Sequence, residues 1–502
     1  MSVIRRFPTA AIAVTFFLVG WAWMWCTPPS DGPDEASHYV RMVGLSQGQL
    51  FGVAVADEAP LDDLFSSAPI GSQRTRLNRE SGLFLLSTAA MPASACNQFD
   101  GSRPYNCPSA APGESSVEVR SFHARTLPTS YLFPALLSKL GTTAVEKFAW
   151  GRLGYLLQGT ALLAAAAYAV RPLVARRCPG VALIVLGATP LATYQLATIS
   201  PSGTEWAATI AFAAVLIRLL HEPRRSWLVA FAASAALATL SRDSGVLVVP
   251  VTVCVVGIAH RERLVHLIRT RPAGPLAACA VFLCLTAAAT WRLFMQAPGR
   301  TPELSASVAI DIVRHVPSLA LFSVGRIGWL TTSTGLVVSA IWLLVTAAAT
   351  FLAVAASRSR IATLLAIGAG WLIVNSILEV SLRPTGFGVQ ARYALPVLSA
   401  GILSIATIPP GQLQSVLKER RILVSAAVTS AFGHLVSMVT MIWRHTQGLW
   451  NSWPFQHPAW APPVGWFAAS IFVIVATLAI LSAVMASAPE GSTLDDEFLA
   501  TQ

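Results

Sequence analysis

Apolar runs of about 20 residues recur along most of the chain, and each is bounded by charged residues or by Pro and Gly. A helix needs about 20 apolar residues to cross the hydrocarbon core of a bilayer. The pattern predicts about twelve membrane-spanning helices. They are expected at residues 8–26, 153–170, 179–199, 203–220, 226–241, 244–259, 273–291, 333–356, 361–380, 393–408, 422–442 and 465–486.

The same pattern divides the chain into four regions. Residues 1–26 form the first transmembrane helix, and the polar segment 27–125 is the first exterior loop, with short helices. Residues 126–486 form a multi-helix transmembrane core, and 487–502 are an acidic cytoplasmic tail. The predicted fold class is an all-α polytopic membrane protein.

Composition supports this class. The 502 residues are 54% hydrophobic and only 12% charged, whereas soluble domains are about 25% charged. The net charge of +11 comes from small basic clusters between apolar runs, with no basic stripe that carries interleaved aromatics, so nucleic acid is not an expected partner.

The basic clusters also predict the orientation. Lys and Arg concentrate in alternate loops, as they do in loops that face the cytoplasm. We therefore expect both termini inside the cytoplasmic membrane and the segment 27–125 outside. The clusters are Arg5 and Arg6, Arg171 to Arg177, Arg218 to Arg225, Arg261 to Arg271, Arg358 and Arg360, and Lys418 to Arg421.

Two cysteines, Cys96 and Cys107, lie in "ACNQFDGSRPYNC" within the long polar segment. An exterior compartment permits oxidation, and this segment has little apolar core of its own. A disulfide between them is the favoured interpretation, and two free thiols are the alternative.

The stretch "PPSDGPDEASHYVRM" follows the first apolar run directly. Asp31 or Gly32 is suited to cap a helix, and Pro33 suits its first position. Asp34 and Glu35 then fall in the first turn, where the helix dipole favours negative charge.

At helical spacing His38 stands one turn after Asp34 and three residues after Glu35, and Arg41 follows His38 by three. One short helix could present a carboxylate, an imidazole and a cation to one pocket just outside the bilayer. Simple capping with solvated His and Arg side chains explains the same pattern. The Asp34–His38 pair could also ligate a divalent metal ion, but two ligands do not complete a site.

Other polar groups are predicted on the same side of the membrane. Arginines there suit a phosphate, because a guanidinium pairs with it in a two-pronged geometry. The same residues can be explained without a substrate site, as polar residues of ordinary turns, as surface ion pairs and as an interfacial aromatic belt. The candidates are Arg242, Arg383, Arg392 and Arg444 for a phosphate, and Arg41, Trp329, Gln390 and Tyr393 for the rest of a substrate pocket.

The motifs "PDEASH", "TISPSGTEW", "SVGRIGWL" and "GVQARYALPVL", with the Trp- and Pro-rich last outer loop, resemble a large family of bacterial multi-pass membrane proteins. That family is catalogued as a domain of unknown function and grouped with the GT-C superfamily of membrane glycosyltransferases. Its Pro-x-Asp-Glu-x-x-His and Gln-x-Arg-Tyr patterns match Pro33, Asp34, Glu35 and His38, and Gln390, Arg392 and Tyr393.

This chain departs from the family in one turn, where Ser202 takes the place of an acidic residue. That departure weakens any claim that the turn supplies a catalytic acid.

The resemblance implies a GT-C-like bundle with a large first exterior loop, a polyprenyl-phosphate sugar donor and a catalytic carboxylate in that loop. The expected acceptor is an envelope glycan, glycolipid or protein. Asp34 or Glu35 would be the general base, and His38 would orient or tune it. A transporter or flippase for a lipid-linked saccharide is the alternative, and a member that has lost catalysis is a third possibility.

Overall fold

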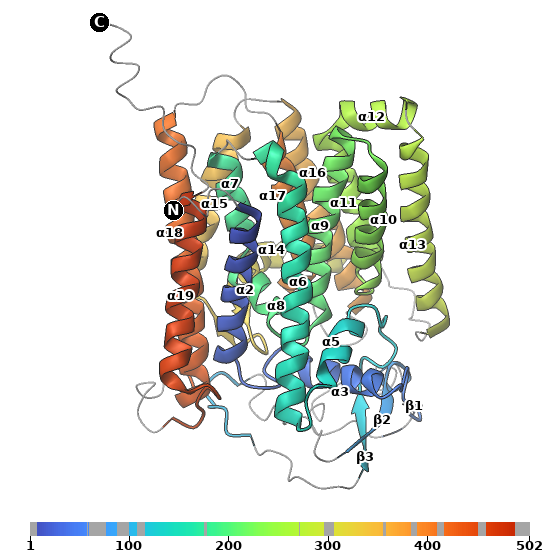
Figure 1. The fold of residues 1–502 in the computed structure, drawn as a ribbon, viewed down its shortest axis with the longest axis vertical. Coiled ribbons are helices and arrows are strands. Elements are labelled where there is room, and N and C mark those ends of the chain that lie inside the picture. Colours follow the sequence, from blue (N-terminus) through green and yellow to red (C-terminus); the bar gives the residue numbers. More distant parts are fainter. Residues whose placement is uncertain are drawn as a thin grey trace, which may run out of the picture.

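The computed structural model describes residues 8–57, 59, 77–87, 100–107, 116–174, 178–270, 272–295, 306–354, 358–382, 389–408, 416–449 and 458–486. These residues form a helical bundle with a small α/β region at one end (Figure 1). The predicted class of an all-α polytopic membrane protein is confirmed in its main feature. The acidic tail predicted at 487–502 lies outside the described residues.

Seven described helices are long and apolar enough to cross a membrane. They are α2 (Pro8–Cys26), α6 (Ala144–Val174), α9 (Pro201–His221), α13 (Ala273–Met295), α16 (Arg358–Leu382), α18 (Val416–Gln447) and α19 (Gly465–Ala486).

The other five predicted spans differ from a continuous long helix. Three are shorter apolar helices, namely α10 (Arg225–Leu240), α15 (Leu336–Val354) and α17 (Leu395–Thr407). The span predicted at 179–199 is broken into α7 (Cys178–Gly187) and α8 (Pro190–Leu196), where Thr189 accepts a hydrogen bond from the Ala192 amide and caps α8.

The fifth is α11 (Gly245–Ala259), which meets α12 (Arg261–Thr270) at a bend of 103° and would make an eighth span if the pair is counted as one. Helix α12 lies flat across one end of the bundle (Figure 1). Its buried Leu267 faces the core while Val265 and Ile268 stay exposed. The 20-residue helix α14 (Ala306–Gly325) was not predicted.

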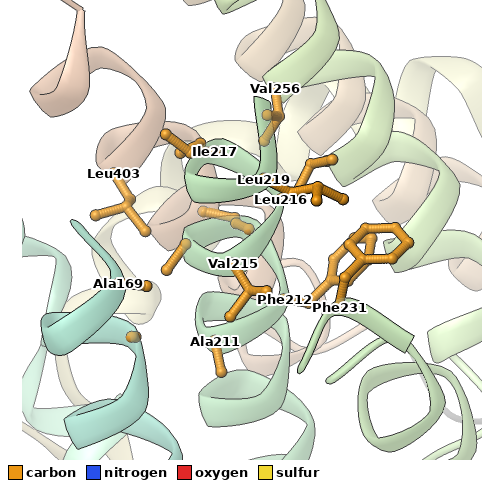
Figure 2. Packing of buried hydrophobic residues seen from close by; sticks show 14 of the residues in the cluster. Ala169, Ala211, Phe212, Val215, Leu216, Ile217, Leu219, Phe231, Val256 and Leu403 are labelled. Atoms are coloured by element: carbon orange, nitrogen blue, oxygen red, sulfur yellow. The ribbon is translucent and has the colours of Figure 1, made fainter. Parts of the chain in front are cut away.

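Helix α9 is the centre of the bundle. Of its apolar window, 89% is buried, against 17% for the peripheral α13. Small residues such as Ala211 and Ala214 let neighbouring helices approach closely, and α9 packs against α6, α10 and α17. Figure 2 shows this packing, with Phe212 beside Phe231 of α10 and with Leu403 of α17 nearby.

The end of the bundle opposite α12 carries the polar segment (Figure 1). This end of the bundle contains α3 (Glu35–Ser46), α5 (Leu132–Ser138) and a three-stranded antiparallel sheet. The strands lie in the order β1 (Val53–Ala54), β2 (Gly82–Ser87) and β3 (Ser116–Ser121). Residue Leu83 pairs with Arg120.

The sheet packs on α3 through Phe84, which is fully buried. A Cβ at Gly44 would lie 2.2 Å from the Phe84 ring, so glycine is needed for this approach. The sheet was not predicted. It packs on α3, which also contacts α5 and α6.

Two short elements complete this end of the molecule. The hairpin of β4 (Arg326–Ile327) and β5 (Thr332–Ser333) follows α14, and the 3-10 helix η4 (Ala391–Tyr393) precedes α17. Both contribute residues to the site described next.

Candidate active site

Helix α3 begins later than the sequence predicts. Glu35 is its first residue and Asp34 is its N-cap, without a side-chain capping hydrogen bond. The prediction that Asp31 or Gly32 caps the helix and that Pro33 opens it is therefore wrong. Asp34 has φ 62° and ψ 9°, a left-handed conformation that costs a non-glycine residue about 1–3 kcal/mol. Surrounding contacts must hold this backbone in place.

The carboxylate of Glu35 supplies several of those contacts. Arg152 of α6 donates to both of its oxygens, from Nε to Oε1 at 2.8 Å and from Nη2 to Oε2 at 2.7 Å. The backbone amides of Ile199 and Gly32 donate to the same oxygens at 2.9 and 3.0 Å. Glu35 is fully buried, so its carboxylate joins α3 to α6 and to the turn before α9.

Asp34 has a different environment. Arg392 of η4 donates from Nη2 to Oδ2 at 3.0 Å, and 37% of the Asp34 side chain remains exposed while Arg392 is 4% exposed. Burial alone would raise the pKa of Asp34, but Arg392, with smaller contributions from His123 and Arg242, lowers it, and the pKa lies below its ordinary value. Asp34 is therefore ionised at neutral pH and accessible from solvent.

A second guanidinium flanks the same place. Arg242 lies over the ring of Tyr393, 4.3 Å from its centroid, and Arg392 lies 5.3 Å from that centroid. Arg242 forms a long ion pair with Glu205 at 3.8 Å and keeps 22% of its side chain exposed. Two guanidiniums on one aromatic ring have the charge and the donors with which an anion could be bound.

Two histidines lie on the other side of Asp34. His38 shares a hydrogen bond of 2.7 Å between its Nδ1 and the Tyr131 hydroxyl. Its ring stacks on that of His123, with centroids 3.9 Å apart and planes at 20°. Burial lowers the pKa of His38 well below its ordinary value and that of His123 to about 4. Both imidazoles are therefore neutral at physiological pH.

Two predicted pocket residues donate hydrogen bonds to backbone carbonyls and are not paired with Asp34. The buried guanidinium of Arg41 donates to the carbonyls of Leu50 and Thr126. Trp329, in the β4–β5 hairpin, donates from Nε1 to the Ser30 carbonyl at 3.1 Å. They hold the loop around α3, and their role as substrate contacts stays a prediction.

Arg444, predicted to bind phosphate, pairs with another carboxylate. Its Nη1 donates to Asp31 Oδ1 at 2.8 Å, and His445 Nε2 lies 3.2 Å from Asp31 Oδ2. All three side chains are fully buried. Burial would raise the pKa of Asp31, but His445 and Arg444 lower it overall. This cluster fastens the loop before α3 to the end of α18.

The remaining predicted residues are placed only in part. Gln390 is the N-cap of η4, two residues before Arg392. Arg383 and Cys96 lie outside the described residues. Cys107 is disulfide-bonded, and its pairing with Cys96 stays a prediction.

Sequence reasoning missed four residues that shape the site: Arg152, His123, Tyr131 and the role of Asp31. Each acts across a long sequence separation, as in the 117 residues between Glu35 and Arg152. The one signal in the sequence was a charged residue, Arg152, at the start of an apolar span, where an ion pair is expected.

Comparison with solved structures gives distant likenesses. The chain is similar to ArnT from Cupriavidus metallidurans bound to undecaprenyl phosphate, with 13% identity and a TM-score of 0.42, over 95% of this chain and 75% of that one. The apo state of ArnT gives 14% identity and a TM-score of 0.38, over 72% and 66% of the two chains.

Comparison with families is decisive for membership. None of the curated proteins matches the chain. A family model described as "Predicted membrane protein (DUF2142)" matches residues 17–400, which include α3, both histidines, Arg242 and Arg392. The chain therefore belongs to the DUF2142 family of multi-pass membrane proteins.

Proposed function

We propose that the protein is a membrane glycosyltransferase that moves a sugar from a polyprenyl-phosphate donor to an acceptor hydroxyl on an envelope glycan, glycolipid or protein. One observation carries the proposal. A solvent-accessible carboxylate, Asp34, lies beside two guanidiniums, Arg392 and Arg242, at the end of the helical bundle that carries α3 and the three-stranded sheet.

The position suits a lipid-linked substrate. Asp34 follows α2 by only eight residues, so it lies close to the end of a membrane-spanning helix. A lipid-borne phosphate resides at this depth, at the boundary between hydrocarbon and water. Arg392 and Arg242 would bind its oxygens and stabilise the charge that develops on the leaving phosphate.

In the proposed reaction the acceptor oxygen attacks the anomeric carbon while the bond from that carbon to the phosphate oxygen breaks. The electron pair leaves with the phosphate, and Asp34 takes the acceptor proton as general base. A single displacement inverts the anomeric centre. The activated phosphate ester needs no protonated carboxyl on the leaving side, unlike glycoside hydrolysis.

Arg392 links donor binding to the base. In the free protein its charge keeps the pKa of Asp34 low. A bound phosphate competes for that guanidinium, and the weakened ion pair leaves Asp34 with a higher pKa. The carboxylate thus becomes a better base once the donor is in place. Glu35 would position this arrangement through Arg152.

We place this end of the molecule on the outer face of the cytoplasmic membrane. The opposite end carries the basic residues of α12, Arg261, Arg263 and Arg269, and such clusters favour the cytoplasm. The first residues of α2 and the last residues of α19 lie toward that opposite end (Figure 1). This supports termini on the cytoplasmic side.

The test uses the full chain in lipid nanodiscs with a panel of labelled polyprenyl-phosphate sugars and a detergent extract of envelope glycolipids. We expect a labelled product, and we expect Arg242→Gln to raise KM for the donor. A control is Arg79→Gln, which alters an exposed pair with Asp57 in the same polar segment. Movement of the donor across the bilayer without any product would contradict the proposal and support the transporter alternative.

A further inference from the structure

Three metal-binding side chains meet beside the two arginines. Ligand atoms of Asp34, His38 and His123 all lie within 4.8 Å of one another. Asp34 is the N-cap of α3 and His38 lies in its first turn, where the His38 amide donates to the Asp34 carbonyl at 2.9 Å. His123 comes from the turn that follows β3. The fold therefore adds the third ligand that the sequence motif lacks.

The surroundings of His38 are those of a metal ligand. Its Nδ1 lies 2.7 Å from the Tyr131 hydroxyl, and in the tautomer whose Nδ1–H donates to that oxygen, Nε2 has its lone pair free for an ion. Ligating histidines almost always use their second nitrogen in such a bond, which fixes the ring orientation.

We propose that Asp34, His38 and His123 bind one divalent first-row transition ion, such as Zn²⁺ or Mn²⁺. The donor set of two imidazoles and one carboxylate selects this class. Mg²⁺ and Ca²⁺ prefer oxygen ligands throughout. Three protein ligands also leave a coordination position open for a substrate oxygen.

Binding requires a modest closure of the site. With bonds of about 2.1 Å and tetrahedral angles, ligand atoms lie about 3.4 Å apart. Asp34 is partly exposed, and only Oδ2 of its carboxylate is engaged by Arg392. Its other oxygen can turn toward the imidazoles without loss of that ion pair.

Two positive groups face the site, Arg392 and Arg242. They oppose a free cation, but an anion that bridges the ion and a guanidinium removes the conflict. Inorganic phosphate should therefore tighten binding of the ion. This inference deepens the proposed function, because it uses the same carboxylate, yet it is measured without any activity.

The experiment measures metal content and Co²⁺ absorption of the purified full chain after chelator treatment and reloading with Zn²⁺ or Co²⁺. We expect one ion per chain and tighter binding with phosphate. His123→Phe keeps a ring to stack on His38 but removes the ligand, so it should weaken binding at least about tenfold, which corresponds to about 1.4 kcal/mol. His123→Asp, which can ligate, and His315→Ala, an exposed histidine on α14, should retain the ion.

Absence of a bound ion in the parent protein, or equal binding by parent and His123→Phe, would overturn the proposal. Thermal unfolding of each variant verifies that it is folded. Sugar transfer by a metal-free protein would show that the reaction does not need the ion and would leave the proposed function intact. Ion binding without any sugar transfer would support the metal site and contradict the proposed function.

Discussion

The two adjacent carboxylates at the start of α3 each pair with an arginine, and the two pairs differ in their access to solvent. Glu35 and Arg152 are 0% and 5% exposed, and backbone amides satisfy the carboxylate further. Asp34 is 37% exposed and accepts from Arg392 with one oxygen. Residues next to each other in the chain therefore serve different purposes. Glu35 joins the loop to the bundle, and Asp34 is open to solvent at the proposed substrate site.

The largest stability effect is expected at the buried pair. Glu35→Gln leaves the Arg152 charge buried without its counter-ion, and loss of one partner of a buried ion pair costs about 3–5 kcal/mol. Thermal unfolding in detergent should show a clear loss of stability.

The matched control is Asp57→Asn. Asp57 also accepts two-pronged hydrogen bonds from an arginine, Arg79, but both side chains are about half exposed. Exposed pairs contribute little, so this variant should unfold close to the parent temperature. Similar losses in both variants would mean that burial does not distinguish the two kinds of pair.

A smaller effect, on pH dependence, is expected at the accessible pair. Arg392 contributes most to holding the pKa of Asp34 below its ordinary value against the effect of burial, so the carboxylate stays ionised as pH falls. In Arg392→Gln this contribution is lost and the pKa of Asp34 rises. The carboxylate is then protonated at a higher pH, and the acidic limb of the kcat/KM profile should move to higher pH.

Arg392→Lys is the control for this shift. It retains the positive charge, so the acidic limb should stay near that of the parent. A lysine cannot bind the donor phosphate with the two-pronged geometry of a guanidinium, so kcat/KM should fall at every pH. An acidic limb that is the same in Arg392→Gln and in the parent would show that Asp34 is not the group that titrates.

The sequence predicted the long apolar helices well, because their periodic composition is a local property. It did not predict α14, since Asp311, Arg314 and Pro317 interrupt its apolar pattern. Helix α12 was expected to be a basic loop for a similar reason. Its charges are compatible with a helix that lies at the membrane surface, because only part of its circumference contacts the core.

The candidate site was predicted in its residues but not in its pairings. Spacing along one helix placed Asp34 and His38 together. No local pattern could assign Arg392, which lies 358 residues from Asp34, or Arg152 to Glu35. His123 had no motif around it. Whether Asp34 or Glu35 is the better candidate for the base depends on those partners, and therefore on the three-dimensional fold.

The most direct test of the account compares sugar transfer by Asp34→Asn and Glu35→Gln at equal concentrations of folded protein. A lost general base lowers the rate by about 10²–10⁴-fold. We predict a loss of that size for Asp34→Asn with unfolding near the parent temperature. The part of Glu35→Gln that remains folded should keep most of its activity. Full activity in Asp34→Asn, together with a lost rate in folded Glu35→Gln, would contradict the assignment of Asp34 as the base.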